Sequence, residues 1–590
     1  MHRHPGGGPG GSVTCPIEAF PEIRLYRPFP PKGPTLLLVI TGTATSGRPA
    51  EEPPREGSDP DDTLEAAAVD GTAVAEPGDT AGAQAVGEAA GEAESGAPGG
   101  ATAAVEPEER PGGEAAPRPA ARFLRSHRHL IAVSVLCALS SALNCSLSLL
   151  RFAHFQVATY DLVIFDQAVR GYSHFSAPTV PLRGVTGGLG MDYIQLADHF
   201  SPILAVLAPL YWLHDGPVTL LVAQAVLFAL AIPFVWMFTR RVLGTPHAYL
   251  VSMAYAISWP IAQATAVEFH EVAFVPLLSA IAVERLHAGR RLPGLLAVLG
   301  LLLTKEDLGL MVAGIGIWLF FTGQRRLGAG LAFTGVAVFE VVRKFLIPLA
   351  GGNPAYYTRY SKLGEDLPQM LWSAVTRPHE FVGMLFDDHS KWDTWGLLLW
   401  PALFVCLLSP LVLAALPLIL ERLLADSDNW WSTGWHYDAF VVLILLMAGV
   451  DGAARLIRWL ERRGVPRPGH GLRLAYAAAV FAVAVTTVPY RPFDNLMSPD
   501  FYHSDPRTEA REQAMSLVPD GVVVEASDDF GARLSGRTTV LWWDYQKRGT
   551  PWIVASVNND LRGVVDSYLT EGYELRLDRD DIVVLHRIGA

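Results

Sequence analysis

Acidic and imidazole side chains recur in the polar turns that separate the long apolar segments of this sequence. The turns carry Asp161, Asp166, Asp198, His199, Glu268, His270, Glu271, Glu306 and Asp307. Carboxylates combined with imidazoles, and without thiols, suit general-base catalysis or the binding of a hard to borderline divalent metal. Charged groups beside membrane segments are costly unless they are solvated, paired or functional. We therefore interpret these turns as candidate walls of one active site.

The first of these walls is the stretch FQVATYDLVIFDQAVRG at 155–171. On a helix, the spacing of Asp161 and Asp166 corresponds to a rotation of roughly 500°, so the two acids do not share a stripe. We expect Asp161 to be the principal catalytic acid or base, and Asp166 to be a second, differently placed catalytic acid. The alternative is structural, with both acids capping an interfacial helix or pairing with Arg151 and Arg170.

Other polar residues predict substrate contacts. The candidates for substrate binding are His199, Glu306, Asp307, Arg343, Arg359, His436 and Tyr437. An arginine suits a phosphate because its planar fork binds two oxygens at once. Each group also has a simpler interpretation. Glu306 and Asp307 fit an exposed apex with a capping acid, Arg343 fits a snorkelling side chain, and Tyr437 fits an aromatic belt.

Apolar runs long enough to cross a bilayer recur between residues 130 and 489 and predict an all-α membrane bundle of about eleven helices. Arginine pairs and clusters fall in alternate short connections, which places those connections and the N-terminus in the cytoplasm. An odd number of spans then puts the C-terminus outside. The charged turn Lys305–Asp307 is expected at the outer apex of a hairpin formed by 292–304 and 308–321.

Composition divides the chain into three parts. Residues 1–124 are expected to be a disordered, acidic, cytoplasmic tail, because 17 acids and 3 bases lie between Arg48 and Glu114 and account for the net charge of −13. Residues 125–489 form the membrane domain, and 490–590 a small extracytoplasmic α/β domain with strands at 522–526, 538–542 and 582–586 and helices at 507–517 and 561–571. No basic stripe suits nucleic acid, and the four cysteines show no disulfide or zinc spacing.

Five motifs carry a resemblance to a known family. They are YDLVIFDQ (Tyr160–Gln167), DHFSPIL (Asp198–Leu204), FHEVAF (Phe269–Phe274), TKEDLG (Thr304–Gly309) and the pair His436-Tyr437. The region from about 150 to 440, and more weakly the C-terminal region, resembles an uncharacterised bacterial family of polytopic membrane proteins known as a domain of unknown function. That family is distantly similar to the GT-C glycosyltransferases, which use polyprenyl-phosphate sugars outside the membrane.

The resemblance implies roles for particular residues. Asp161 matches the acid that follows the first span and is catalytic in GT-C enzymes, and Asp166 falls where many members carry a second acid. Glu268 and His270 occupy the turn where metal-dependent members carry an acid-x-acid pair. His270 departs from that pattern, which leaves the use of a divalent metal open. The implied partners are the bilayer of the bacterial cytoplasmic membrane, a polyprenyl-phosphate sugar donor and a cell-envelope acceptor, with no nucleic acid.

Two other functions compete with a glycosyltransferase. A transporter or lipid flippase predicts ionisable residues near the bilayer middle and related half-molecules. The predicted spans contain mainly Gln224, Gln263 and Glu340, no clear internal repeat and no phosphate-binding loop of an attached ATPase. A non-catalytic scaffold predicts that the C-terminal domain, as a docking element, is the working part.

Overall fold

The computed structural model describes residues 119–353, 360, 362–364, 367–465 and 469–589 of the 590-residue chain. Arg118–Ala590 forms one compact unit. The predicted acidic tail up to residue 118, and Arg359, lie outside the described residues.

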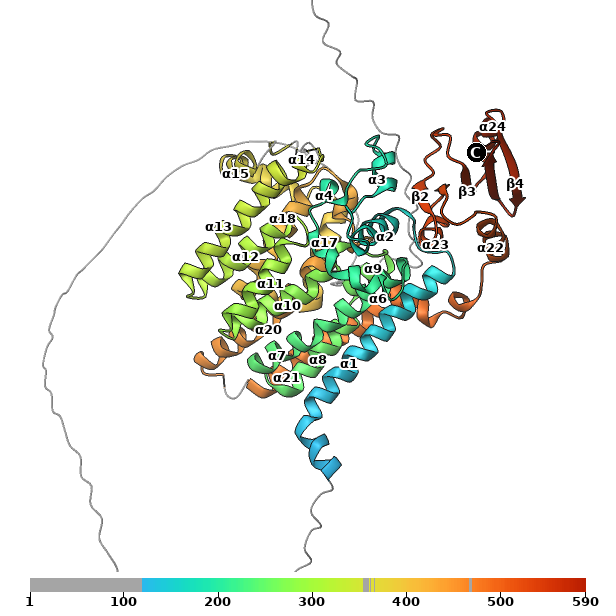
Figure 1. The fold of residues 1–590 in the computed structure, drawn as a ribbon. Coiled ribbons are helices and arrows are strands. Elements are labelled where there is room, and N and C mark those ends of the chain that lie inside the picture. The colour runs from blue at the N-terminus through green and yellow to red at the C-terminus, as the bar shows by residue number, and fades with distance from the viewer. Residues whose placement is uncertain (1–118, 354–359, 361, 365–366, 466–468, 590) are drawn as a thin grey trace, which may run out of the picture. The chain divides into compact units, whose positions relative to one another are not determined.

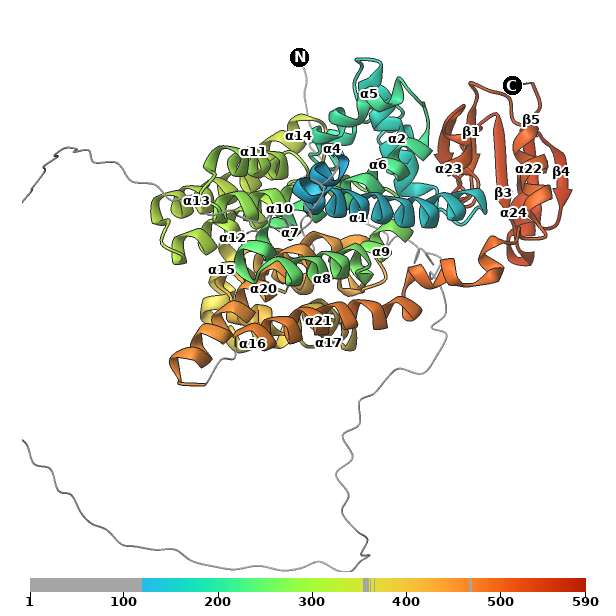
Figure 2. The same cartoon turned by 90° about the horizontal axis from the view of Figure 1, so that it is seen from below.

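Helices dominate the unit and are packed as a bundle, with a small sheet at one end (Figure 1). Seen from below, α1, α8 and α21 run lengthwise beside one another (Figure 2). The helices of ten or more residues before the sheet are α1 (Pro119–Ala153), α2 (Tyr160–Ser173), α6 (Pro217–Leu230), α7 (Ile232–Val242), α8 (Thr245–Ala256), α10 (Phe274–His287), α11 (Arg291–Leu302), α12 (Leu308–Phe321), α13 (Arg325–Val341), α15 (Leu367–Thr376), α17 (His389–Leu399), α20 (Ala439–Arg462) and α21 (Gly469–Thr487). The shorter ones are α3 (Pro181–Thr186), α4 (Gln195–Asp198), α5 (Ala208–Tyr211), α9 (Trp259–Ala266), α14 (Ile347–Leu349), α16 (Pro378–Met384), α18 (Leu416–Leu424) and α19 (Asp428–Trp431).

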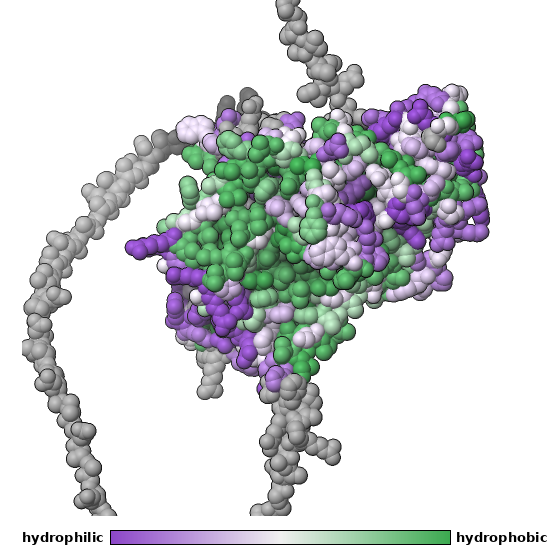
Figure 3. Space-filling view, in the orientation of Figure 1, coloured by the Kyte–Doolittle hydropathy of each residue, from purple (hydrophilic) through white to green (hydrophobic). Residues whose placement is uncertain are grey.

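Four helical stretches of the described chain are long and apolar enough to cross a membrane: His127–Ala153, Pro217–Val242, His436–Arg462 and Gly469–Tyr490. Three shorter apolar helices are Pro202–Tyr211, Arg291–Leu302 and Leu308–Phe321. In Figure 3 the apolar surface forms a broad continuous area over the helices, whereas the region of the sheet is mostly polar. The chain is therefore a predicted membrane protein with several apolar helices, and the number eleven stays a prediction.

Several predicted apolar runs are broken in the structure. The predicted hairpin of 395–408 and 411–424 contains 3-10 turns at Trp400–Ala402, Val405–Leu408 and Pro410–Ala414, so that only its two ends are α-helical, in α17 and α18. Prolines interrupt this segment, and a proline removes a backbone donor and clashes with the preceding turn. Irregular backbone of this kind is tolerated at membrane depth only where it is buried in protein or lines a cavity. The predicted break between 304 and 308 is confirmed, because α11 and α12 are separate helices.

The C-terminal region is a five-stranded mixed sheet of order β2-β1-β3-β5-β4. Its strands are β1 (Val523–Ala526), β2 (Thr539–Trp542), β3 (Trp552–Ser556), β4 (Tyr573–Arg579) and β5 (Ile582–Arg587), and its helices are α22 (Thr508–Ser516), α23 (Gly531–Leu534) and α24 (Arg562–Leu569). β2 and β3 pair in parallel with β1, while β5 pairs antiparallel with β3 and β4. The sequence correctly predicted β1, β2, β5, α22 and α24 but not β3 or β4.

Candidate active site

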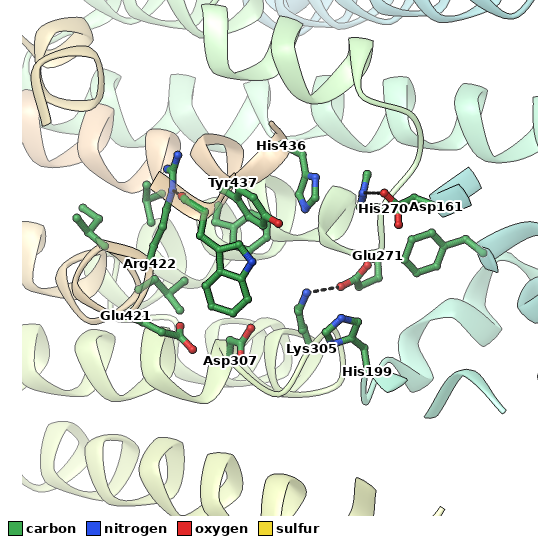
Figure 4. A pocket seen from close by; sticks show the side chains of 16 residues that line it. Asp161, His199, His270, Glu271, Lys305, Asp307, Glu421, Arg422, His436 and Tyr437 are labelled. Atoms are coloured by element: carbon green, nitrogen blue, oxygen red, sulfur yellow. Dashed lines mark hydrogen bonds and ion pairs between the residues drawn. The ribbon is translucent and has the colours of Figure 1, made fainter. Parts of the chain in front are cut away.

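One pocket collects polar side chains from segments that are far apart in the chain (Figure 4). It encloses about 180 Å³ and is lined by Asp161, Phe165, His199, His270, Glu271, Lys305, Asp307, Leu418, Ile419, Glu421, Arg422, Trp430, His436, Tyr437, Phe440 and Val441. Of the residues predicted to be functional, Asp161, His199, His270, Asp307, His436 and Tyr437 are thus brought together. Helix ends supply most of them, which agrees with the expectation that the polar turns converge.

Asp161 lies in the first turn of α2 and faces the turn that follows α9. Its Oδ2 atom lies 3.2 Å from Nε2 of His270 (Figure 4), and the Asp161 side chain is 39% exposed. Desolvation in the pocket raises the pKa of Asp161, but the charge and hydrogen bond of His270, followed by the charge of Lys305, outweigh it and hold the pKa below its usual value. Asp161 is therefore a carboxylate at neutral pH, the form that accepts a proton.

His270 joins Asp161 to the start of α20. Its ring stacks on that of His436 with 3.6 Å between centroids, and His436 in turn lies 4.4 Å from the ring of Tyr437. Burial lowers the pKa of His270, whereas Asp161 raises it, and the net shift is upward. Both imidazoles are buried, and in each the Nδ1 atom lacks a hydrogen-bond partner.

The turn that carries His270 is held by α6. Nε2 of Gln224 donates to the carbonyl oxygens of Glu268 and Ala264, at 2.8 and 3.2 Å, and its Oε1 accepts from the backbone N–H of His270 at 3.4 Å. Glu268 has φ = +50°, a left-handed conformation that costs energy for a residue other than glycine. Its carboxyl Oε1 accepts from the N–H of Ala158 at 3.0 Å. Burial raises the pKa of Glu268 to about 7.

Lys305 and His199 supply positive charge to the same pocket. Nζ of Lys305, from the break between α11 and α12, lies 3.1 Å from Oε1 of Glu271. Nδ1 of His199 lies 2.7 Å from Oε1 of Glu306, whose Oε2 accepts from the N–H of Phe200 at 3.0 Å. Burial and Lys305 lower the pKa of His199, but the Glu306 carboxylate outweighs both and raises it to about 9. His199 is therefore protonated at neutral pH.

The far end of the pocket is formed by α18 and α19. Arg422 lies 2.5 Å from Asp438 through Nη1 and also donates to the carbonyl oxygens of Trp430 and Ser432. The neighbouring Glu421 interacts with Asp307. Burial, followed by the charge of Glu306, raises the pKa of Asp307 to about 6. Glutamate and arginine next to each other in an apolar run are typical of a functional segment. The pair Glu421-Arg422 is therefore a sequence signal that places α18 at the site.

Four predicted site residues are placed elsewhere or lie behind the pocket. Asp166 is fully buried, accepts from the Tyr211 hydroxyl at 2.8 Å and pairs with Arg170 at 2.9 Å. These contacts match the alternative in which Asp166 pairs with Arg170 as part of the structure. Arg343 lies in a π-helical turn (Val342–Leu346) and pairs with Glu340 at 3.3 Å. Glu306 and Glu268 support residues of the pocket without lining it. Asp161 faces the pocket and Asp166 does not, as expected for two acids that do not share a stripe of one helix.

The donor set does not fit the predicted metal site. In the described residues, no group of three or more His, Cys, Asp or Glu side chains is arranged to hold a metal ion. Glu268 and His270, the proposed ligands, are engaged by Ala158 and Asp161.

Comparisons with solved structures found weak similarities. ArnT from Cupriavidus metallidurans, bound to undecaprenyl phosphate, matches with a TM-score of 0.44 and 13% identity over 79% of this chain and 99% of that chain. AglB, the oligosaccharyltransferase from Archaeoglobus fulgidus, in complex with an inhibitory peptide and a dolichol-phosphate, matches with a TM-score of 0.37 and 10% identity over 74% and 70%. Among curated proteins no match was found.

A protein-family comparison matches most of the sequence. The matched residues are 151–568, and the family is described as predicted membrane protein (DUF2079). This range contains all five motifs that carry the resemblance to a domain of unknown function. The chain therefore belongs to the DUF2079 family of predicted membrane proteins.

Proposed function

We propose that this protein is a membrane glycosyltransferase that moves a sugar from a polyprenyl-phosphate carrier to a cell-envelope acceptor. The observation that carries the proposal is the convergence of Asp161, Lys305 and His199 on one pocket. Sugar transfer needs a base for the acceptor hydroxyl and positive charge for the departing phosphate. A carboxylate and two cations beside apolar helices meet both needs.

Asp161 is the proposed general base. The acceptor hydroxyl gives its proton to Asp161 while its oxygen attacks the anomeric carbon of the donor sugar. The bond between that carbon and the phosphate oxygen breaks, and its electron pair stays on the phosphate. A single displacement of this kind inverts the configuration of the anomeric carbon.

Lys305 and His199 are the proposed partners of the leaving phosphate. His199 is cationic at neutral pH because Glu306 raises its pKa to about 9, and the ammonium group of Lys305 pairs with Glu271. Charge fixed in a recessed site stabilises a developing anion more than charge in water does. The acids that pair with the two cations, Glu271 and Glu306, keep them in place before substrate arrives.

The remaining walls suit the sugar and its lipid. The rings of Trp430 and Tyr437 offer apolar faces on which a sugar ring can stack, next to the polar edge formed by Asp307 and Glu421. Leu418, Ile419 and Val441 provide an aliphatic side for an isoprenoid chain. This distribution is typical of ligand pockets, in which a mainly apolar wall carries a few orienting polar groups.

We place the pocket at the outer face of the bacterial cytoplasmic membrane. The arrangement rests on about eleven spans, a cytoplasmic N-terminus and an extracytoplasmic C-terminal domain, with the arginine-rich connections in the cytoplasm. Labelling of single cysteines by a membrane-impermeant thiol reagent tests this: a cysteine at Asp192 reacts in intact cells, and one at Arg458 reacts only after lysis. The opposite pattern overturns the orientation.

Transfer itself is tested with purified protein in lipid nanodiscs. The probes are undecaprenyl-phosphate-linked radiolabelled mannose, glucose and arabinose, with a cell-envelope extract as acceptor and release of undecaprenyl phosphate as the readout. Asp161→Asn is expected to abolish release, while Asp192→Asn, a change of the same kind at an exposed loop acid, keeps the wild-type rate. Full activity of Asp161→Asn at equal protein level contradicts the assignment.

A further inference from the structure

The helix that carries Asp161 belongs to two hydrophobic cores at once. One side of α2 presents Leu162, Phe165 and Val169 to the core of the helical bundle. Its other side presents Val163, Ile164 and Ala168 to the core of the C-terminal sheet, where they pack with residues that include Val524, Phe530, Val540 and Val554. The sheet therefore covers the catalytic helix directly, and its core is incomplete without α2.

Polar contacts tie the N-terminus of α2 to the loop that follows β1. The hydroxyl group of Thr159, which is fully buried, donates to the carbonyl oxygens of Ser527 and Asp528 at 3.0 and 2.9 Å. The hydroxyl oxygen of Thr159 also accepts a hydrogen bond from the N–H of Gly531 at 2.9 Å. A Cβ atom at Gly531 would lie 2.3 Å from Cγ2 of Thr159, so only glycine permits this approach.

Thr159 occupies the N-cap position of α2 but does not cap it. A threonine at this position usually accepts a hydrogen bond from a backbone N–H of its own helix, and here no such side-chain bond is formed. The hydroxyl is used for the C-terminal domain instead.

A second polar contact fixes the next part of α2. Nε2 of Gln167 donates to the carbonyl oxygen of Val540 in β2 at 2.9 Å, and its Oε1 accepts from the N–H of Leu182 in α3 at 3.2 Å. Gln167, Val540 and Leu182 are all buried. With Thr159 fixed at one end and Gln167 in the middle, α2 has little freedom to rotate or slide against the sheet.

We propose that the C-terminal domain positions the general base, with Thr159 as the positioning residue. Thr159 precedes Asp161 by two residues, so displacement of its backbone moves the carboxylate relative to His270 and to the pocket. The inference rests on the proposed role of Asp161, and it replaces a passive docking role for the C-terminal domain. Thr159 itself touches no reacting atom.

The test uses the full chain in nanodiscs and compares Thr159→Val, which keeps the size and removes the hydroxyl, with Thr159→Ser, which keeps the hydroxyl. Thr538→Val is the matched control, because the buried hydroxyl of Thr538 donates to Leu534 at 2.8 Å within the C-terminal domain. Hydrogen–deuterium exchange of residues 160–166 is measured without any substrate. We expect faster exchange there in Thr159→Val only.

Turnover of the radiolabelled undecaprenyl-phosphate sugars gives a second measurement. In Thr159→Val we expect kcat to fall by about 100-fold, as is typical of a misplaced catalytic group, with the donor KM within twofold of the wild type. Thr159→Ser is expected to restore most of kcat. If Thr159 had a purely structural role, Thr159→Val would lower thermal stability without lowering kcat at an unchanged KM.

The outcomes separate this inference from the proposed function. Unchanged exchange at 160–166 in Thr159→Val overturns the positioning role, whatever the substrate is. Unchanged kcat with Asp161→Asn inactive overturns it as well and leaves the glycosyltransferase proposal standing. If Asp161→Asn keeps its activity, Asp161 is not the general base. The positioning of a general base is then overturned too, even if hydrogen–deuterium exchange at 160–166 is faster in Thr159→Val.

Discussion

Oδ2 of Asp161 lies 3.2 Å from Nε2 of His270, and the two residues lie side by side at one end of the pocket (Figure 4). Asp161 lies in the first turn of α2, whereas His270 follows α9 after more than one hundred intervening residues. The imidazole also rests on His436 from the start of α20. The two contacts of His270 therefore link three separate segments, and the contact with Asp161 holds the pKa of the proposed base below its usual value.

Removal of His270 should shift the pH dependence of transfer. Desolvation raises the pKa of Asp161, and His270 is the main group that lowers it. In His270→Gln the pKa of Asp161 should rise, so that more of the carboxyl is protonated and inactive at low pH. The acidic limb of the profile of kcat/KM should therefore move to higher pH, measured as release of undecaprenyl phosphate. An unchanged acidic limb in an active variant contradicts the coupling.

Loss of the positive charge at Lys305 should weaken use of the donor. A hydrogen bond to a charged group contributes about 1.5–3 kcal/mol, which corresponds to a loss of roughly 10- to 100-fold in kcat/KM for Lys305→Gln. Lys305→Arg should keep part of the activity because the charge remains. Lys547→Gln removes a cation paired with Glu571 on the surface of the C-terminal domain and serves as control. If Lys305→Gln and Lys547→Gln have equal kinetics, Lys305 does not bind the leaving phosphate.

The sequence supported the general architecture because its signals are local. The break around Lys305 was predictable from three charges between two apolar runs, since such charges avoid hydrocarbon. Asp161 was predictable as a candidate site residue from its place as an acid after a long apolar segment. The strands β1, β2 and β5 were predictable from short runs of β-branched residues.

Other features depend on contacts between distant segments and were beyond the sequence. Asp166 looks the same as Asp161 in sequence, yet Tyr211 and Arg170 surround it in the structure. Glu421 and Arg422 were hidden in an apolar run that prolines divide into short turns and one helix. The burial of α2 in the C-terminal core cannot be read from α2 alone, because Val163 and Leu162 differ only in the side of the helix that they occupy.

The buried pair of Arg422 and Asp438 should be essential for folding around the pocket. Their contact of 2.5 Å is shielded from solvent, and Arg422 also holds the carbonyl oxygens of the segment that carries Trp430. Removing one partner of a buried pair leaves an uncompensated charge and costs about 3–5 kcal/mol. Arg422→Gln should therefore lower the thermal midpoint sharply, and Arg422→Gln combined with Asp438→Asn should lower it less than the sum of the two single changes. The thermal midpoints are measured by fluorescence in detergent. Additive effects of the two changes in this double-mutant cycle would speak against direct coupling between Arg422 and Asp438.

Glu525 should make the stability of the protein depend on pH in an unusual direction. It is fully buried in β1 beside Thr550 and Arg548, and burial raises its pKa to about 7 from an ordinary value near 4.5. Between these two values the unfolded chain releases a proton that the folded chain keeps. Stability from this group is therefore complete at low pH and is lost as the pH rises towards 7, by up to about 3 kcal/mol. In Glu525→Gln this loss should disappear, so thermal midpoints measured from pH 5 to pH 8 should fall less than in the wild type. Parallel curves for the two proteins would show that Glu525 titrates alike in the folded and unfolded states.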